Sequence, residues 1–243
     1  MNQANPDLIR KLKREILSLQ GYRTPVAEEP AVDLPLISQA FPNGIFPTGA
    51  IHEFICEGRN GMAASAGFIS AVLAALMKDR GVAAWINPVR QLFPPALRRF
   101  GAIPEHFIFL DLPEEKDALW AMEEVLHCGG FAAVIGEIRQ LDLTASRRLQ
   151  LAAEKSGVTG FLLRQHTVAL NTIASIARWR INSLPSVQED DLPGVGFPRW
   201  QVELLRVRNG QPGAWTVQWL QDHFKTEVPE TIALPESMHR KTG

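Results

Sequence analysis

Cysteine is scarce in this chain, because only Cys56 and Cys128 occur among its 243 residues. The two thiols are far apart in the sequence and form no Cys-x-x-Cys pair, which favours reduced cysteines in a reducing compartment. The histidines are scattered, and His52-Glu53 lacks the second histidine of a zinc-protease motif. No metal site is therefore predicted.

A surplus of positive charge is also missing. Lys and Arg number 25 against 26 Asp and Glu, so the formal net charge is −1. Proteins that coat nucleic acid through bulk charge need a basic surplus, and any contact with nucleic acid here must be a local patch. With 46% hydrophobic and 21% charged residues, the composition excludes wholesale disorder and a collagen-like or coiled-coil chain.

The sequence has no convincing membrane span or secretion signal. The uncharged stretch 60–77 reaches only the lower limit of a span, which is about 17–25 residues. Glycines and serines dilute it, so a buried helix is the better interpretation. The residues before position 15 are basic rather than apolar, unlike the start of a secretory signal. We therefore expect a cytoplasmic protein.

From about residue 50 the chain alternates short apolar runs with helical segments. This alternation predicts the α/β class, with a mostly parallel sheet, right-handed crossovers and helices on both faces. The apolar runs are 51–56, 82–86, 107–112, 131–138 and 160–163, and the helical segments are 63–79, 95–100, 114–127 and 144–155.

The pattern changes after residue 176. Arg178 and Arg180 alternate with apolar residues, which predicts a strand with one basic, solvated face. Asn209-Gly210 between the apolar runs 199–208 and 214–220 is a strong hairpin signal, so the sheet is expected to end in antiparallel strands. Three tryptophans crowd this hairpin and either complete the core or form a partner-binding surface. They are Trp200, Trp215 and Trp219.

The two ends of the chain differ in character from its body. Residues 1–20 predict an amphipathic helix, in which Leu12 and Ile16 belong to an apolar stripe. That stripe docks either on a partner or back on its own domain. We expect a proline-containing linker at 21–37, one domain at 38–225 and a flexible tail at 226–243.

The junction after the first apolar run lies where a phosphate-binding loop of the GxxxxGK[ST] kind occurs. When Gly61 is aligned with the last glycine, Met62 replaces the lysine and Ala63 replaces the Ser/Thr that binds Mg²⁺. We interpret the segment as a vestigial phosphate loop that binds no nucleotide. The loop comprises Gly58, Arg59, Asn60, Gly61, Met62 and Ala63.

Several segments carry a family resemblance. Residues 41–54 resemble the entry to a RecA-type core, and 118–124, 133–137 and 199–205 resemble the ImuA family. The most specific block is LDLTASRRLQLAAE at 141–154. The resemblance spans roughly residues 38–220 and implies a RecA-like accessory protein of SOS-induced translesion DNA repair. It further implies an adaptor role beside an ImuB-like polymerase subunit and an error-prone C-family polymerase, or association with a RecA-type protein or with itself.

The resemblance does not imply catalysis. Val89 falls on the catalytic glutamate position of RecA-type ATPases, and Gly136 falls on the Walker-B aspartate position. We therefore expect a pseudo-ATPase with no catalytic residue and no cofactor. The segments that follow the fourth and fifth core strands are short, which indicates weak or no DNA binding. The basic residues left as candidate partner or DNA contacts are Arg147, Arg148, Arg178 and Arg180.

Two alternative functions remain open from the sequence. One is a divergent P-loop ATPase acting on DNA, in which Arg59 takes the role of the missing lysine. The other is a protein-binding inhibitor of cell division that resembles SulA. Nucleotide binding distinguishes the first alternative from the adaptor hypothesis, and retention of polymerase partners distinguishes the second.

Overall fold

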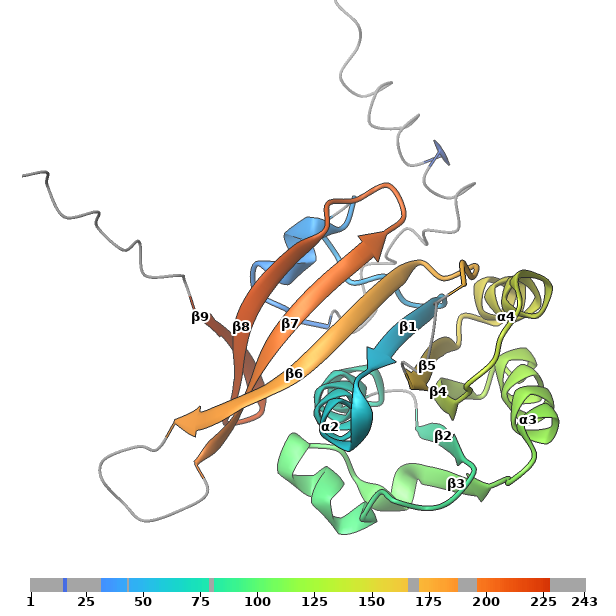
Figure 1. Cartoon of the computed structure of the whole chain (residues 1–243), viewed down its shortest axis with the longest axis horizontal. Helices are drawn as coiled ribbons and strands as arrows, with labels where there is room; N and C mark the ends of the chain where they lie inside the picture. The colour runs from blue at the N-terminus through green and yellow to red at the C-terminus, as the bar shows by residue number, and fades with distance from the viewer. Residues whose placement is uncertain are drawn as a thin grey trace, which may run out of the picture.

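The computed structural model describes residues 15–16, 32–42, 44–78, 81–165, 171–187 and 196–227. Within these residues, nine strands form one mixed sheet in the order β3-β2-β4-β5-β1-β6-β7-β8-β9 (Figure 1). Neighbouring strands from β3 to β6 are parallel, whereas β6 to β9 pair antiparallel. The strands are β1 (Ile51–Cys56), β2 (Val82–Asn87), β3 (Phe107–Asp111), β4 (Phe131–Glu137), β5 (Thr159–Gln165), β6 (Ala177–Val187), β7 (Phe197–Val207), β8 (Gly213–Leu220) and β9 (His223–Glu227).

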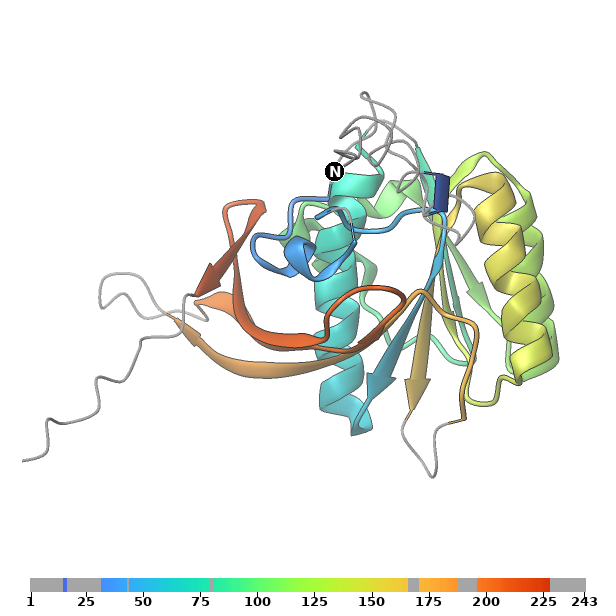
Figure 2. The same cartoon turned by 90° about the horizontal axis from the view of Figure 1, so that it is seen from above.

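Helices cover both faces of the sheet. The helix α2 (Gly58–Leu76) lies on one face, and α3 (Glu115–His127) and α4 (Leu143–Ser156) lie side by side on the other (Figure 2). The predicted α/β class with antiparallel C-terminal strands is therefore confirmed. Short 3-10 helices are η1 (Ile37–Ala40), η2 (Pro94–Phe100) and η3 (Pro104–His106).

Local sequence explains where the central elements begin and end. Every residue of β1 is buried, as expected of a strand in the middle of a parallel sheet. Asp142 begins α4, because its carboxylate accepts a hydrogen bond of 2.6 Å from the Ala145 N–H, and Gly157 ends the helix at a φ of 86°. Among the described residues, no helix is long and apolar enough to cross a membrane.

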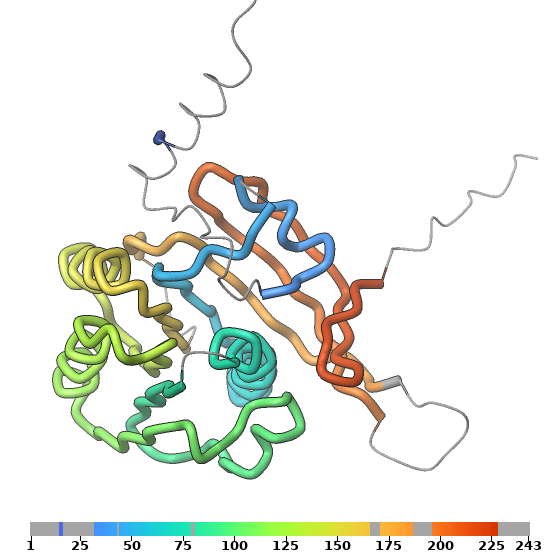
Figure 3. Tube along the Cα trace, turned by 180° about the vertical axis from the view of Figure 1, so that it is seen from behind, coloured from blue at the N-terminus to red at the C-terminus, as the bar shows by residue number. Residues whose placement is uncertain are grey.

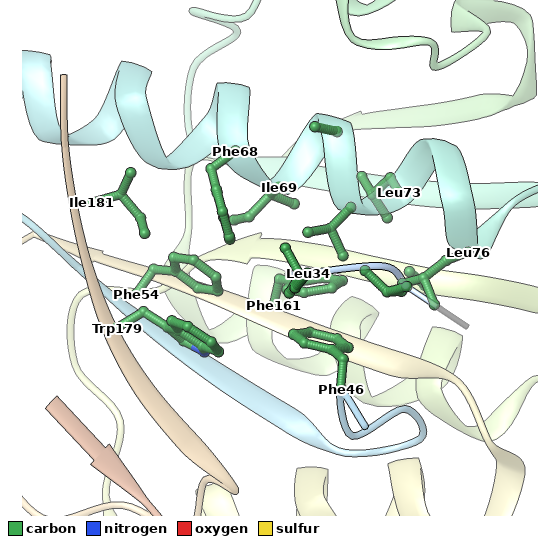
Figure 4. Packing of buried hydrophobic residues seen from close by; sticks show 14 of the residues in the cluster. Leu34, Phe46, Phe54, Phe68, Ile69, Leu73, Leu76, Phe161, Trp179 and Ile181 are labelled. Atoms are coloured by element: carbon green, nitrogen blue, oxygen red, sulfur yellow. The ribbon is translucent and has the colours of Figure 1, made fainter. Parts of the chain in front are cut away.

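The larger hydrophobic cluster lies between α2 and the sheet. Phe68 of α2 faces Phe54, Phe161 and Trp179, which come from β1, β5 and β6 (Figure 4). The ring centroids of Phe68 and Trp179 are 6.3 Å apart, within the range of favourable aromatic contacts. A smaller cluster packs α3 and α4 on the opposite face of the sheet.

The antiparallel strands belong to the same core. Trp200 of β7 and Phe224 of β9 have ring centroids 5.9 and 5.3 Å from that of Phe68. Trp200 and Trp219 are buried, and Trp215 is half-buried against the cluster. Of the two interpretations of these tryptophans, completion of the core is the one that the structure supports.

The boundary between the predicted linker and the domain needs a correction. The sequence assigned 21–37 to a linker, but Val32, Leu34 and Ile37 are buried in the larger cluster. Residues 32–37 lie against the antiparallel strands (Figure 3). The prolines indicated a linker, yet the apolar side chains of this described part bury enough surface to join the core.

The predicted tail is shortened for the same reason. Thr226, placed in a tail at 226–243, lies in β9 and donates a hydrogen bond of 2.6 Å to the Pro35 carbonyl. Residues 228–243 lie outside the described residues. So does the predicted helix at 1–20, except for residues 15–16.

A buried ion cluster crosses three adjacent strands. Glu53 of β1 is fully buried and accepts bonds of 2.7 Å from Arg164 of β5 and 2.6 Å from Arg178 of β6. Both guanidinium groups also donate to Asn171, at 3.0 Å each. The cluster therefore ties β1 to both neighbours and to the segment that connects β5 with β6.

A buried histidine occupies the other face of β1. The His52 ring stacks on Phe46 with centroids 4.5 Å apart, and its Nδ1 accepts a hydrogen bond of 3.2 Å from the Trp179 indole. Its Nε2 is 2.7 Å from the Pro47 carbonyl, so the geometry fits a neutral ring that donates from Nε2. Burial lowers the pKa of His52 to about 4, although the bond to Pro47 acts in the opposite direction.

Removal of the Glu53 carboxylate should destabilise the fold strongly. In Glu53→Ala two guanidinium groups lose their shared partner, and breaking a buried pair in this way costs about 3–5 kcal/mol. Urea unfolding measures the loss. In the matched control Glu57→Ala, which removes the exposed partner of Arg180, the loss should stay below about 1 kcal/mol. Equal losses in the two variants would contradict this account.

Acid should weaken the fold through His52. The unfolded chain binds a proton at this ring near pH 6.5, whereas the folded ring stays neutral down to about pH 4. The contribution of His52 to stability is therefore complete above pH 6.5 and is lost as the pH falls towards 4. Unfolding free energies across this range should fall less steeply in His52→Phe than in the parent chain. Identical slopes would show that the ring titrates normally.

Candidate functional site

The carboxyl ends of the parallel strands are where α/β folds of this kind bind ligands. A single residue, Glu57, separates β1 from α2, and the helix already begins at Gly58. The segment 58–63, predicted as a vestigial loop, is therefore the start of a helix. An added Cβ at Gly61 would lie 3.4 Å from the Cys56 carbonyl carbon, which is an ordinary contact distance. The described chain therefore passes from strand to helix through one residue and forms no extended loop at this point.

The side chains at this junction differ from those of a phosphate-binding loop of the GxxxxGK[ST] kind. Met62 and Ala63, at the positions of the missing lysine and Ser/Thr, line an apolar cavity. Arg59 and Asn60 are exposed on the first turn of α2. Cys56 is buried, and burial raises the pKa of its thiol to about 11, so it is unreactive at neutral pH.

The other strand ends also lack the groups of an ATP site. A side chain at Gly136 would meet the Met122 sulfur at 2.9 Å, so methionine fills the space of the Walker-B aspartate. Val89 is 64% exposed. The carboxylate of Asp111 is held by Asn87 and by Arg90, each at 2.8 Å. Within the described part of the chain, no group of three His, Cys, Asp or Glu side chains is placed to hold a metal ion.

A cavity of about 370 Å³ lies at this end of the sheet. It lies between the first half of α2 and the segment 91–100, which includes η2 and runs beside α2 (Figure 1). The sequence predicted a helical segment at 95–100, but it did not predict that this segment forms part of a cavity wall. The only local signal was the pair of large apolar residues, Phe93 and Phe100, at the two ends of the segment. The lining residues are Arg59, Met62, Ala63, Ala66, Gly67, Ser70, Trp85, Gln91, Leu92, Phe93, Ala96, Leu97, Phe100, Glu137 and Leu163.

Glu137 is the one carboxylate in the cavity wall. Burial raises its pKa, and the charge of Arg139 offsets only part of that effect. Among the described residues, none forms a hydrogen bond or ion pair with this carboxylate. The lining also contains one basic side chain, Arg59, so the cavity wall carries one charge of each sign.

Three of the four candidate arginines are engaged within the fold. Arg178 is bound to Glu53 and only 17% of its side chain is exposed. Arg180 pairs with Glu57 and Glu203, and Arg148 pairs with Glu123. The predicted alternation is present, since apolar residues of β6 are buried and its arginines lie on the partly exposed face. That face is not freely solvated and basic, because acids on neighbouring elements pair with both arginines.

The remaining candidates do not join these arginines in one site. Arg147 is exposed on α4, away from the cavity on the α2 face. Ile16 is helical and 51% exposed, so the described domain leaves half of this side chain uncovered. Leu12 lies outside the described residues.

The fold is similar to that of a solved recombinase. The RadB recombinase matches with a TM-score of 0.51 and 15% sequence identity, over 73% of this chain and 90% of RadB. At this identity the likeness shows the fold alone, which is RecA-like. No protein-family profile matches the chain.

Curated proteins give a closer sequence relationship. The cell division inhibitor SulA of Photorhabdus laumondii is 27% identical over 123 residues, which cover 49% of this chain and 70% of SulA. Protein ImuA of Caulobacter vibrioides is 36% identical over 212 residues, which cover 82% of this chain and 86% of ImuA. A second strain of the same species gives an identical match. Because this relationship extends over most of both proteins, the chain belongs to the ImuA family.

Proposed function

We propose that this protein is a non-catalytic accessory factor of SOS-induced, error-prone DNA repair. It acts as an adaptor that brings proteins together and does not turn over nucleotide. The observation that carries this proposal is the junction of β1 and α2, where a helix begins at Gly58 with no phosphate loop before it. The ImuA relatives connect the chain with DNA-damage tolerance.

The expected partners follow from the family. They are an ImuB-like polymerase subunit and an error-prone C-family polymerase, which together copy damaged templates. A RecA-like domain without an ATP site offers such a complex a rigid scaffold. Adaptor function then depends on surface contacts, and it is insensitive to the nucleotide state of this chain.

A second candidate function has one specific observation in its favour. The sequence match to the cell division inhibitor SulA covers about half of this chain. Affinity purification of the tagged protein from damaged cells separates the two functions. Retention of the polymerase subunits supports the adaptor, whereas retention of a cell-division protein without them supports the inhibitor.

The adaptor should neither bind nor hydrolyse ATP. Millimolar Mg-ATP should leave the melting temperature unchanged, because a ligand that binds only the folded state raises it. Phosphate release should stay at the protein-free background with and without single-stranded DNA. Turnover that disappears in Arg59→Glu, but persists in the control Lys116→Glu on α3, would make the chain an unconventional ATPase.

Binding to single-stranded DNA should be weak and should involve few phosphates. Three of the four candidate arginines are paired with carboxylates, and each phosphate contact contributes a salt slope of about −0.7. Fluorescence anisotropy with an oligo(dT) probe should therefore give a slope no steeper than about −2. A slope steeper than about −4 would indicate an extended basic groove and contradict this expectation.

A further inference from the structure

The cavity beside α2 has the size and composition of a recognition pocket. Its volume of about 370 Å³ lies within the range of roughly 300–1,000 Å³ that is common for ligand sites. Met62 and Ala66 form one wall, Leu97 and Phe100 form the other, and Trp85 lies at its base on β2. These walls favour a bulky apolar group over a polar one.

Glu137 gives this apolar cavity one strong polar preference. Its side chain comes from the end of β4, and it has no hydrogen bond or ion pair within the described part of the chain. Glu137 is partly exposed, so its carboxylate is open to a charged partner, and a cation supplied from outside can pair with it. The pocket therefore favours an apolar group that lies next to a positive charge.

The rim of the cavity extends the apolar surface outward. Phe93 lines the cavity and is 68% exposed. A small molecule enclosed in the cavity would leave much of this side chain in water. A polypeptide that inserts one side chain and runs across the rim would cover it as well, as at protein interfaces anchored by aromatic residues.

We propose that this cavity binds a partner polypeptide through one inserted Leu or aromatic side chain, with a neighbouring Lys or Arg paired to Glu137. This inference rests on the proposed adaptor function and names the chemistry of one docking site. The lining also contains one basic residue, Arg59, so an acidic peptide or a nucleotide would pair with Arg59 and be opposed by Glu137, whereas the proposed partner pairs with Glu137.

The proposal can be tested without knowing the natural partner. Peptides that bind the full chain are selected from a random library. Selected peptides should contain Leu, Phe or Trp within two positions of Lys or Arg. In Glu137→Gln, which keeps the shape of the side chain and removes its charge, affinity for such a peptide should fall about tenfold or more. Selection on Glu137→Lys should instead yield peptides with Asp or Glu beside the apolar residue.

Two exposed aromatic residues provide a matched pair of controls. Phe93→Ser should weaken the selected peptide at least about fivefold, because Phe93 is part of the rim. Trp120→Ser removes an aromatic side chain that is 64% exposed, close to the 68% of Phe93. Trp120 lies on α3, on the opposite face of the sheet. Peptide affinity should not change in this variant. Unfolding curves for each variant confirm that the domain stays folded.

Three results would overturn the proposal. The first is a library that yields no peptide, and the second is a set of peptides whose binding is indifferent to Glu137→Gln and Phe93→Ser. The third is tighter binding of free phenethylamine than of any peptide, which would assign the cavity to a small amine. The adaptor function is tested separately. ATP turnover would refute the adaptor function, but it would not change the result of the peptide selection.

Discussion

The ion cluster around Glu53 keeps the parallel and antiparallel halves of this sheet in register. A lone carboxylate in the centre of a sheet is costly, so the two arginines on β5 and β6 must hold their positions. Those arginines in turn fix Asn171, and Arg206 of β7 donates to the Ser175 hydroxyl at 2.8 Å. The described segment between β5 and β6 is thus held in place by guanidinium groups that are internal to the fold.

This constraint bears on the two arginines of β6. The Arg178 guanidinium is bound to the buried Glu53, and Arg180 pairs with Glu57 and Glu203. Their charge therefore stabilises the sheet and contributes little to the field outside it. Arg148 of α4 also has an acidic partner, but 63% of its side chain is exposed.

The sequence was sufficient to predict eight of the nine described strands and the fold class, because hydrophobic periodicity and the Asn209-Gly210 turn are local signals. It missed β9, whose five residues were divided between the end of the domain and the predicted tail. It could not predict that Glu53 pairs with Arg164 and Arg178, since a single sequence carries no information on contacts between residues more than a hundred positions apart. The same limit applies to the cavity. Glu137 ends β4 and Phe93 lies in the connection between β2 and β3, so only the folded sheet brings them to one cavity.

The end of the sheet that holds nucleotide in RecA-type proteins has a different lining here. Because α2 begins directly after β1, Met62 and Ala66 meet the segment 91–100 across an apolar cavity. Glu57 is paired with Arg180, and the cavity wall contains one acid, Glu137, and one base, Arg59. The proposed absence of catalysis and the proposed docking of a protein partner therefore rest on the same feature, the apolar junction of β1 with α2.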